Sequence, residues 1–192
     1  MQQVDKSETP KKKFDAKQLI SKLGTVIALL VLVIAVTIMD PEFLMPDNLL
    51  NLLRQTSINA IIAFGMTFVI LTGGIDLSVG SILAFTGAVT ASTIAGGTPA
   101  WLAVIFGLLL GGLFGCLNGL IIAYGKAAAF IATLATMTIF RGATYVFTNG
   151  NPVTGTKINN SFFFQYIGRG YLFGIPFPII IMVIAVKGSL KM

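Results

Sequence analysis

The sequence predicts an all-α fold, a polytopic transmembrane helical bundle of about six spans. Three observations predict it. Of the 192 residues, 55% are hydrophobic and only 10% are charged, whereas a soluble domain carries about 25% charged residues. The mean hydropathy of +0.89 describes the whole chain rather than one apolar patch. The apolar residues also form separate runs that approach the roughly 20 residues needed to cross a bilayer.

The chain opens with a basic segment, residues 1–22, which precedes the first apolar run, Leu23–Met39. The segment holds six lysines against three acidic residues. Positive charge directly before a span predicts a cytoplasmic tail. With only one aromatic residue among the lysines, the segment does not favour nucleic-acid binding. The run is long for a signal peptide and Asp40-Pro41 follows it, so we expect an uncleaved first helix.

An acidic stretch, residues 40–47, follows the first span, and we expect it on the opposite side of the membrane. The second span lies between Arg54 and Asp76. We expect it to end at Gly73-Gly74, because glycine tolerates the left-handed conformation that ends helices.

No residue from Leu77 to Gly125 is charged, and this run is too long for one helix. The sequence Gly96-Gly97-Thr98-Pro99 predicts a break. The third span is therefore expected over Leu77–Ala95 and the fourth over Trp101–Tyr124. Aromatic residues at both ends of the fourth span fit the two membrane interfaces.

The fifth span is expected over Ala127–Phe147, with Arg141 embedded in it; a re-entrant segment is the alternative. A polar, turn-rich stretch follows, and Tyr171–Val186 is the last apolar run and the expected sixth span. These crossings place some cations inside, as the charge rule requires: Lys126, Lys187 and Lys191. They place two outside, against the rule: Lys157 and Arg169.

Small residues recur every four positions along the fourth span and predict close helix packing. A four-residue step keeps side chains near one face of a helix, and small residues there let another backbone approach in lipid. The stripe consists of Gly107, Gly111, Gly115 and Gly119. A second, weaker stripe on the third span consists of Gly80, Ala84 and Ala88.

Four polar residues within or beside the spans are candidates for a substrate pathway: Asp76, Asn118, Arg141 and Asn59. We expect Asp76 to cap the third helix by accepting from its first N–H groups; lining a polar path, or pairing with Arg141, is the alternative. Arg141 either snorkels to an interface or makes an internal polar contact. Asn118 and Asn59 are expected to hydrogen-bond neighbouring helices.

The residue types argue against an enzyme. The chain has no histidine and seven acidic residues, of which six lie at or before Asp47. The single cysteine, Cys116, cannot form an internal disulfide or a zinc site by itself. We therefore expect no catalytic site, no cofactor and no bound metal.

Four blocks of the sequence resemble the permease subunits of ribose-type ABC sugar importers. They are GMTFVILTGGIDLSVGSILAFTGAV (65–89), GCLNGLIIAYGK (115–126), FIATLATMTIFRGATYVFTNGNPVTG (130–155) and FFFQYIGRGYLFGIPFPIIIM (162–182). The resemblance is specific for the family and less so for the sugar. It implies a permease dimer, cytoplasmic ATPase subunits and an extracytoplasmic binding protein that delivers ribose or a related simple sugar.

The resemblance also implies domain boundaries and a location. Such permeases are longer, so we expect an N-terminal half: a cytoplasmic tail (1–22), an incomplete, apparently truncated permease domain (23–186) and a divergent tail (187–192). The expected location is the plasma (inner) membrane, among lipid, with a cytoplasmic N-terminus. Two alternatives stay open: a truncated bundle that does not transport, and an ion-coupled carrier that uses Asp76.

Overall fold

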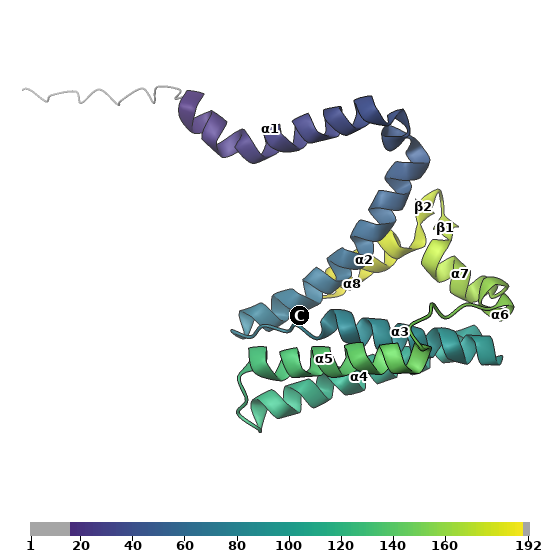
Figure 1. The fold of residues 1–192 in the computed structure, drawn as a ribbon. Coiled ribbons are helices and arrows are strands. Elements are labelled where there is room, and N and C mark those ends of the chain that lie inside the picture. Colours follow the sequence, from purple (N-terminus) through teal and green to yellow (C-terminus); the bar gives the residue numbers. More distant parts are fainter. Residues whose placement is uncertain (1–15, 190–192) are drawn as a thin grey trace, which may run out of the picture. The chain divides into compact units, whose positions relative to one another are not determined.

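Helices make up most of the computed structural model, which describes residues 16–189 (Figure 1). The described residues divide into two compact units, one up to residue 49 and one from residue 50 onward. Most of the expected cytoplasmic tail and the last three residues lie outside the described part.

The first unit contains α1 (Ala16–Met39), the short 3₁₀ helix η1 (Pro41–Leu44) and the start of α2 (Pro46–Leu71). Asp40 ends the apolar run and caps η1, because its carboxylate accepts from the backbone N–H of Glu42 at 3.0 Å. Helix α1 begins before Leu23, within the expected tail, so the helix is longer than its apolar part.

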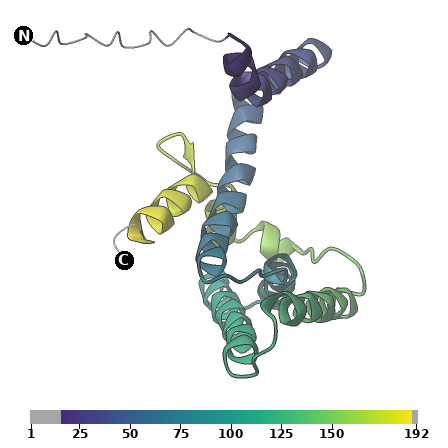
Figure 2. The same ribbon diagram turned by 90° about the vertical axis from the view of Figure 1, so that its left-hand side faces the viewer.

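The second unit is built around three helices that pack against one another: α3 (Val79–Gly96), α4 (Ala100–Ala123) and α5 (Ala129–Thr148). The two views in Figures 1 and 2 both place these helices side by side. Phenyl rings from all three helices meet between them: the ring centroid of Phe114 lies 4.4 Å from that of Phe140 and 6.0 Å from that of Phe85.

Glycine ends α2 and α3 where the sequence predicts, and asparagine ends α5. Helix α2 stops at Leu71 and Gly73 follows with φ +76°. Helix α3 stops at Gly96, and Gly97 adopts φ +107° while its N–H returns to the carbonyl of Ile94. Asn149, with φ +50°, ends α5 in the same left-handed way. The predicted break between the third and fourth spans is therefore confirmed.

The distribution of side chains is opposite to that of a soluble protein. The buried positions are mostly small or hydroxyl-bearing: Ser57, Ser78, Ser81, Thr86, Thr90, Ala103 and Thr133. Large apolar side chains face outward along α2 to α5, for example Leu108, Ile131 and Val146. Without water outside, polar contacts and close packing rather than hydrophobic burial hold such helices together.

Four helices, α2 to α5, are long and apolar enough to cross a membrane by length and composition. Helix α5 has 20 residues, so its length is that of a crossing helix, as expected for the fifth span. Two shorter apolar helices, Leu23–Met39 and Phe177–Gly188, complete the candidates among the described residues. An all-α membrane bundle is thus confirmed, and the expected six spans correspond approximately to these four long and two shorter helices.

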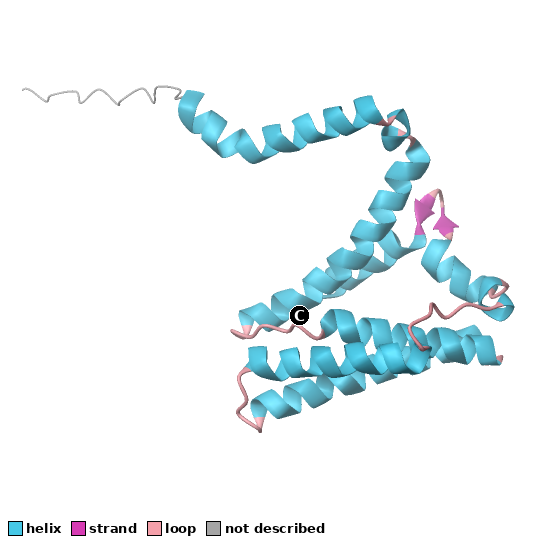
Figure 3. Ribbon diagram, in the orientation of Figure 1, coloured by secondary structure: helices cyan, strands magenta, loops and turns pink. Residues whose placement is uncertain are grey.

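The C-terminal region differs from the expected sixth span. After α6 (Thr156–Asn159) and α7 (Phe162–Arg169), a two-stranded hairpin forms from β1 (Tyr171–Leu172) and β2 (Ile175–Pro176), shown in Figure 3. Helix α8 (Phe177–Ser189) starts only after it. The expected span Tyr171–Val186 is therefore wrong at its start, because Gly174 allows a tight turn inside the apolar run. Pro178 is tolerated in the first turn of α8.

Candidate functional site

A polar junction lies where α2 turns into α3. The carboxylate of Asp76 accepts two hydrogen bonds from Ser78, one from its backbone N–H at 2.8 Å and one from its hydroxyl at 2.6 Å. Ser78 is fully buried and is the residue from which α3 starts. The expected cap is therefore wrong in its position: Ser78, not Asp76, is the N-cap residue of α3, and Asp76 accepts from the N–H of Ser78 rather than from the first N–H groups of the helix.

Asn118 extends this junction from α4. Its side-chain amide donates to the Ser78 hydroxyl oxygen at 2.8 Å, and its side-chain oxygen accepts from the Thr136 hydroxyl of α5 at 2.7 Å. Asn118 is 4% exposed, so these bonds replace contacts with water. We refer to Asp76, Ser78, Asn118 and Thr136 as the polar junction; it joins α3, α4 and α5. The expected hydrogen bond of Asn118 to neighbouring helices is confirmed.

Thr133, one turn before Thr136 on α5, holds the loop that leads into α3. Its hydroxyl oxygen accepts from the N–H of Leu77 at 3.2 Å and lies 3.1 Å from the carbonyl of Ile75. Thr133 is 1% exposed. Backbone groups in this loop have no hydrogen-bond partner within a helix, so the hydroxyl of Thr133 takes that place. The loop is thereby fixed against α5.

The junction orders helices and provides no reactive group. Every side chain in it is a carboxylate, hydroxyl or amide that already has a partner within the protein. Among the described residues, no group of three or more histidine, cysteine, aspartate or glutamate side chains could hold a metal ion.

Arg141 lies apart from the junction, on a groove between α3 and α5. The groove has a volume of about 720 Å³. Small residues of α3 form one wall and longer side chains of α5 and of the following loop form the other. The lining residues are Leu77, Gly80, Ser81, Ala84, Ala88, Ala91, Met137, Arg141, Thr144, Tyr145, Thr148, Gly150, Asn151, Pro152 and Val153.

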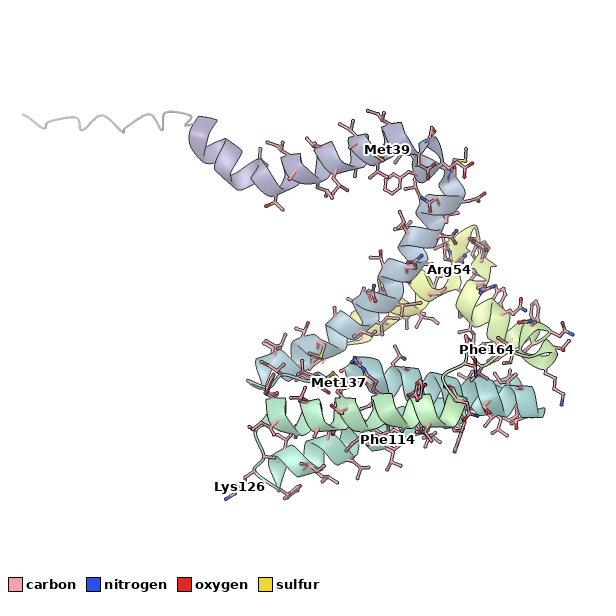
Figure 4. The ribbon with its side chains drawn as sticks, viewed as in Figure 1. Met39, Arg54, Phe114, Lys126, Met137 and Phe164 are labelled. Atoms are coloured by element: carbon pink, nitrogen blue, oxygen red, sulfur yellow. The ribbon has the colours of Figure 1, made fainter. Side chains whose placement is uncertain are left out.

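The alternative in which Asp76 pairs with Arg141 is not seen within residues 16–189, and the weaker small-residue stripe of α3 lines a groove. The described residues contain no ion pair between Asp76 and Arg141, because the Asp76 carboxylate bonds to Ser78 instead. The weaker stripe of Gly80, Ala84 and Ala88 faces the groove. Figure 4 labels Met137, which comes one turn before Arg141 on α5 and lines the same groove.

Asn59 is exposed on α2 and does not join the polar junction. The described part of the chain shows no hydrogen bond from its side chain to another helix. The structure therefore brings two of the four candidate residues, Asp76 and Asn118, into one network and leaves Arg141 and Asn59 separate. A role for these four residues in a substrate pathway stays a prediction.

Of the four glycines in the α4 stripe, only the first, Gly107, lies in close contact with α3. A Cβ atom at Gly107 would overlap the hydroxyl of Thr90 on α3, so the two helices are in close contact there. At Gly111, Gly115 and Gly119, a Cβ atom would meet nothing within 4 Å. The physical reason is that four residues turn a helix by about 400°, so each step drifts by roughly 40°. Close packing on α3 therefore holds for Gly107 alone.

Sequence reasoning missed three hydroxyl residues in the junction or beside it. Ser78, Thr133 and Thr136 are hydroxyl residues inside or beside apolar runs, and each can bond its own backbone. One signal was present: Thr133 and Thr136 are three residues apart and so share one face of a helix.

A cation outside the junction was also missed. The guanidinium of Arg54 on α2, labelled in Figure 4, donates to the hydroxyl of Tyr171 at 2.6 Å and lies 5.2 Å from the centre of its ring. It also donates to the side-chain oxygen of Asn51 at 3.1 Å. Arg54 therefore ties α2 to the hairpin at residues 171–176.

Comparison with known proteins finds a permease family and several permease relatives. Residues 48–190 match the family described as branched-chain amino acid transport system / permease component. The ribose import permease protein RbsC of Bacillus subtilis (strain 168) is 53% identical over 182 residues, covering 95% of this chain and 56% of that protein. RbsC of Haemophilus influenzae is 54% identical over 156 residues, covering 81% of this chain and 48% of that protein.

A relative of lower identity is named for another sugar. The D-allose transport system permease protein AlsC of Escherichia coli (strain K12) is 40% identical over 182 residues, covering 93% of this chain and 55% of that protein. The chain thus spans about half the length of the curated relatives it matches. No solved structure matches the chain.

Proposed function

Because the chain belongs to the family of branched-chain amino acid transport system permease components, we propose that it forms part of the membrane permease of an ABC importer for ribose or a related simple sugar. The observation that carries this proposal is the identity of 53–54% to two ribose import permeases, against 40% to the D-allose permease. Its fold, a bundle of membrane-length helices with a polar interior, suits that role.

The chain is a multi-pass inner-membrane protein, and its orientation is part of the proposal. We place the N-terminus in the cytoplasm, since the lysine-rich segment 1–22 precedes the first span. The acidic stretch at residues 40–47 then lies outside, and Lys126, between α4 and α5, lies inside (labelled in Figure 4).

In this proposal the chain moves the sugar and other subunits supply the energy. ATP would be hydrolysed on cytoplasmic ATPase subunits, and an extracytoplasmic binding protein would deliver the sugar to a permease dimer. The polar junction supports a structural role for this chain, because its side chains hydrogen-bond to one another and fix the relative positions of α3, α4 and α5.

The groove between α3 and α5 is our candidate for a wall of the sugar path. It combines polar side chains, among them Arg141, Ser81 and Thr144, with apolar ones. Hydrogen-bonding groups on apolar walls are what a polyhydroxylated solute requires. Asp76 and Asn118 would act by positioning: both bond to Ser78, which lies between two groove-lining residues, Leu77 before α3 and Gly80 in its first turn.

A chimera tests the proposed function. This chain replaces the matching half of the Bacillus subtilis ribose permease, which is expressed with its own ATPase and binding protein in cells that lack a ribose permease. As a control for the junction, the matching half of the Haemophilus influenzae ribose permease is inserted in the same way. We expect both chimeras to take up radiolabelled ribose at rates of the same order, with unlabelled ribose competing better than allose.

The outcome that overturns the proposal is equally specific. If the control chimera transports ribose, while this chain inserts at the same level and takes up none, ribose import is not its function. Uptake of allose in preference to ribose would instead change the substrate.

A further inference from the structure

We infer that the hairpin at residues 171–176 is an interfacial anchor: its tip, Phe173, inserts at the boundary between lipid headgroups and acyl chains. The two strands pair Tyr171 with Pro176 and Leu172 with Ile175. Phe173 and Gly174 form the two-residue turn between them, and both have positive φ, +53° and +79°. This inference goes beyond sugar transport and does not depend on which sugar is carried.

The residue at the tip contradicts the local preference of the backbone. Turns with two positive φ values favour asparagine, aspartate or glycine at the first position. A bulky aromatic residue with positive φ is an outlier, and such strain gathers at positions selected for something other than stability. Phe173 is also 96% exposed. Of the phenyl rings that the structure describes, the most exposed one therefore stands on a turn that disfavours it.

The base of the hairpin, in contrast, is held firmly. The hydroxyl of Tyr171 accepts from Arg54, and the carbonyl of Tyr171 accepts from the hydroxyl of Tyr166 at 3.2 Å. The ring centroid of Tyr166 lies 5.3 Å from that of Phe177, at the start of α8. Figure 3 shows the hairpin between α7 and α8. A fixed base with a free tip presents Phe173 as a rigid projection.

Lipid is the occupant that the neighbouring residues favour. The hairpin leads directly into the apolar helix α8, so it is continuous with a segment of membrane character. Helix α7, which precedes it, exposes Phe162 and carries Arg169 in its last turn. No acidic residue occurs after Asp76, so α7, the hairpin and α8 carry no negative side chain that would repel phosphate headgroups. Aromatic rings beside cations are typical of membrane interfaces.

Tryptophan reporters test the depth of the tip. In a Trp101→Phe background, single tryptophans replace Phe173, Leu109 on the exposed face of α4, or Asn151 in a polar loop, and the full chain is placed in vesicles with phosphatidylglycerol. We expect the reporter at position 173 to be quenched by lipids brominated near the headgroup, and several-fold less by aqueous iodide than the one at 151. The reporter at 109 should respond to deeply brominated lipid.

A pair of variants separates anchoring from folding. With Leu172→Trp as the reporter, Phe173→Asn suits the turn and should preserve the hairpin, yet raise iodide quenching several-fold. Phe173→Tyr keeps an interfacial aromatic ring and should leave quenching unchanged. Equal quenching in both variants would contradict the inference.

Three results with the reporter at 173 would overturn the proposal. Iodide quenching equal to that at Asn151 would place the tip in water. Protection from both iodide and brominated lipid would place it against protein. Protection only after a sugar-binding protein is added would make the hairpin a docking element for that protein.

Discussion

Replacing Gly107 by alanine should destabilise the bundle, because the contact between α3 and α4 has no room for a methyl group. The new Cβ would overlap the hydroxyl of Thr90 and lie 3.4 Å from the Cβ of Thr90 and 3.7 Å from the carbonyl oxygen of Thr86. Thr90 would have to rotate and give up its 2.7 Å hydrogen bond to Thr86.

The expected magnitude follows from opposing effects. Overpacking a tight contact costs about 1–3 kcal/mol, and the lost hydrogen bond about 1 kcal/mol. Alanine also stabilises the helix by up to about 1 kcal/mol, because it loses less conformational freedom in a helix than glycine does. We therefore expect Gly107→Ala to lower the free energy of unfolding by about 1–3 kcal/mol.

The assay is reversible unfolding of the protein in mixed micelles, with Gly115→Ala as the matched control. Gly115 lies on the same helix, and an added Cβ there would meet nothing within 4 Å. The control should be neutral or stabilised by up to about 1 kcal/mol. A Thr90→Ala change should relieve most of the cost of Gly107→Ala, since it removes the overlapping hydroxyl. Equal stability of the Gly107→Ala and Gly115→Ala variants would refute the reasoning.

Two further predictions concern the polar contacts. Asn118→Ala should lower the free energy of unfolding by about 1–2 kcal/mol, because it removes interhelical bonds to Ser78 and Thr136; Asn59→Ala, on the exposed face of α2, should change it little, and similar losses in the same micelle assay would contradict the assignment. Thr133→Val keeps the shape but leaves the N–H of Leu77 without its acceptor, so we expect a loss of about 1–3 kcal/mol; hydrogen exchange of that amide no faster than in the unmodified protein would argue against it.

Much of the helical framework could be predicted from the sequence. The third, fourth and fifth spans differ from α3, α4 and α5 by one or two residues at each end. These boundaries are predictable because uncharged runs stop at glycine, proline or asparagine, and such residues end helices through local backbone geometry. The hydrogen bond between Ser78 and Asp76 is local in the same sense, since the two residues are two positions apart.

The remaining features depend on geometry that the sequence does not display. Whether Asn118 meets Ser78 or Thr136 depends on the rotation of α4 against two other helices. The glycine stripe illustrates this point: spacing by four brings Gly107 onto α3, but helical drift turns Gly115 away. The hairpin could not be predicted, because its residues are as apolar as those of a span. Only the turn at Phe173 and Gly174 distinguishes the hairpin from a helix.

The central proposal is that the groove between α3 and α5 forms a wall of the sugar path, and thiol labelling of a cysteine-free chimera tests it most directly. Thr144→Cys places a thiol in the groove, whereas Val146→Cys places one on the 75% exposed outer face of the same helix. We predict that a charged, water-soluble methanethiosulfonate modifies position 144 and blocks ribose uptake, and leaves position 146 unmodified. No reaction at 144, or a reaction without loss of uptake, would contradict the account.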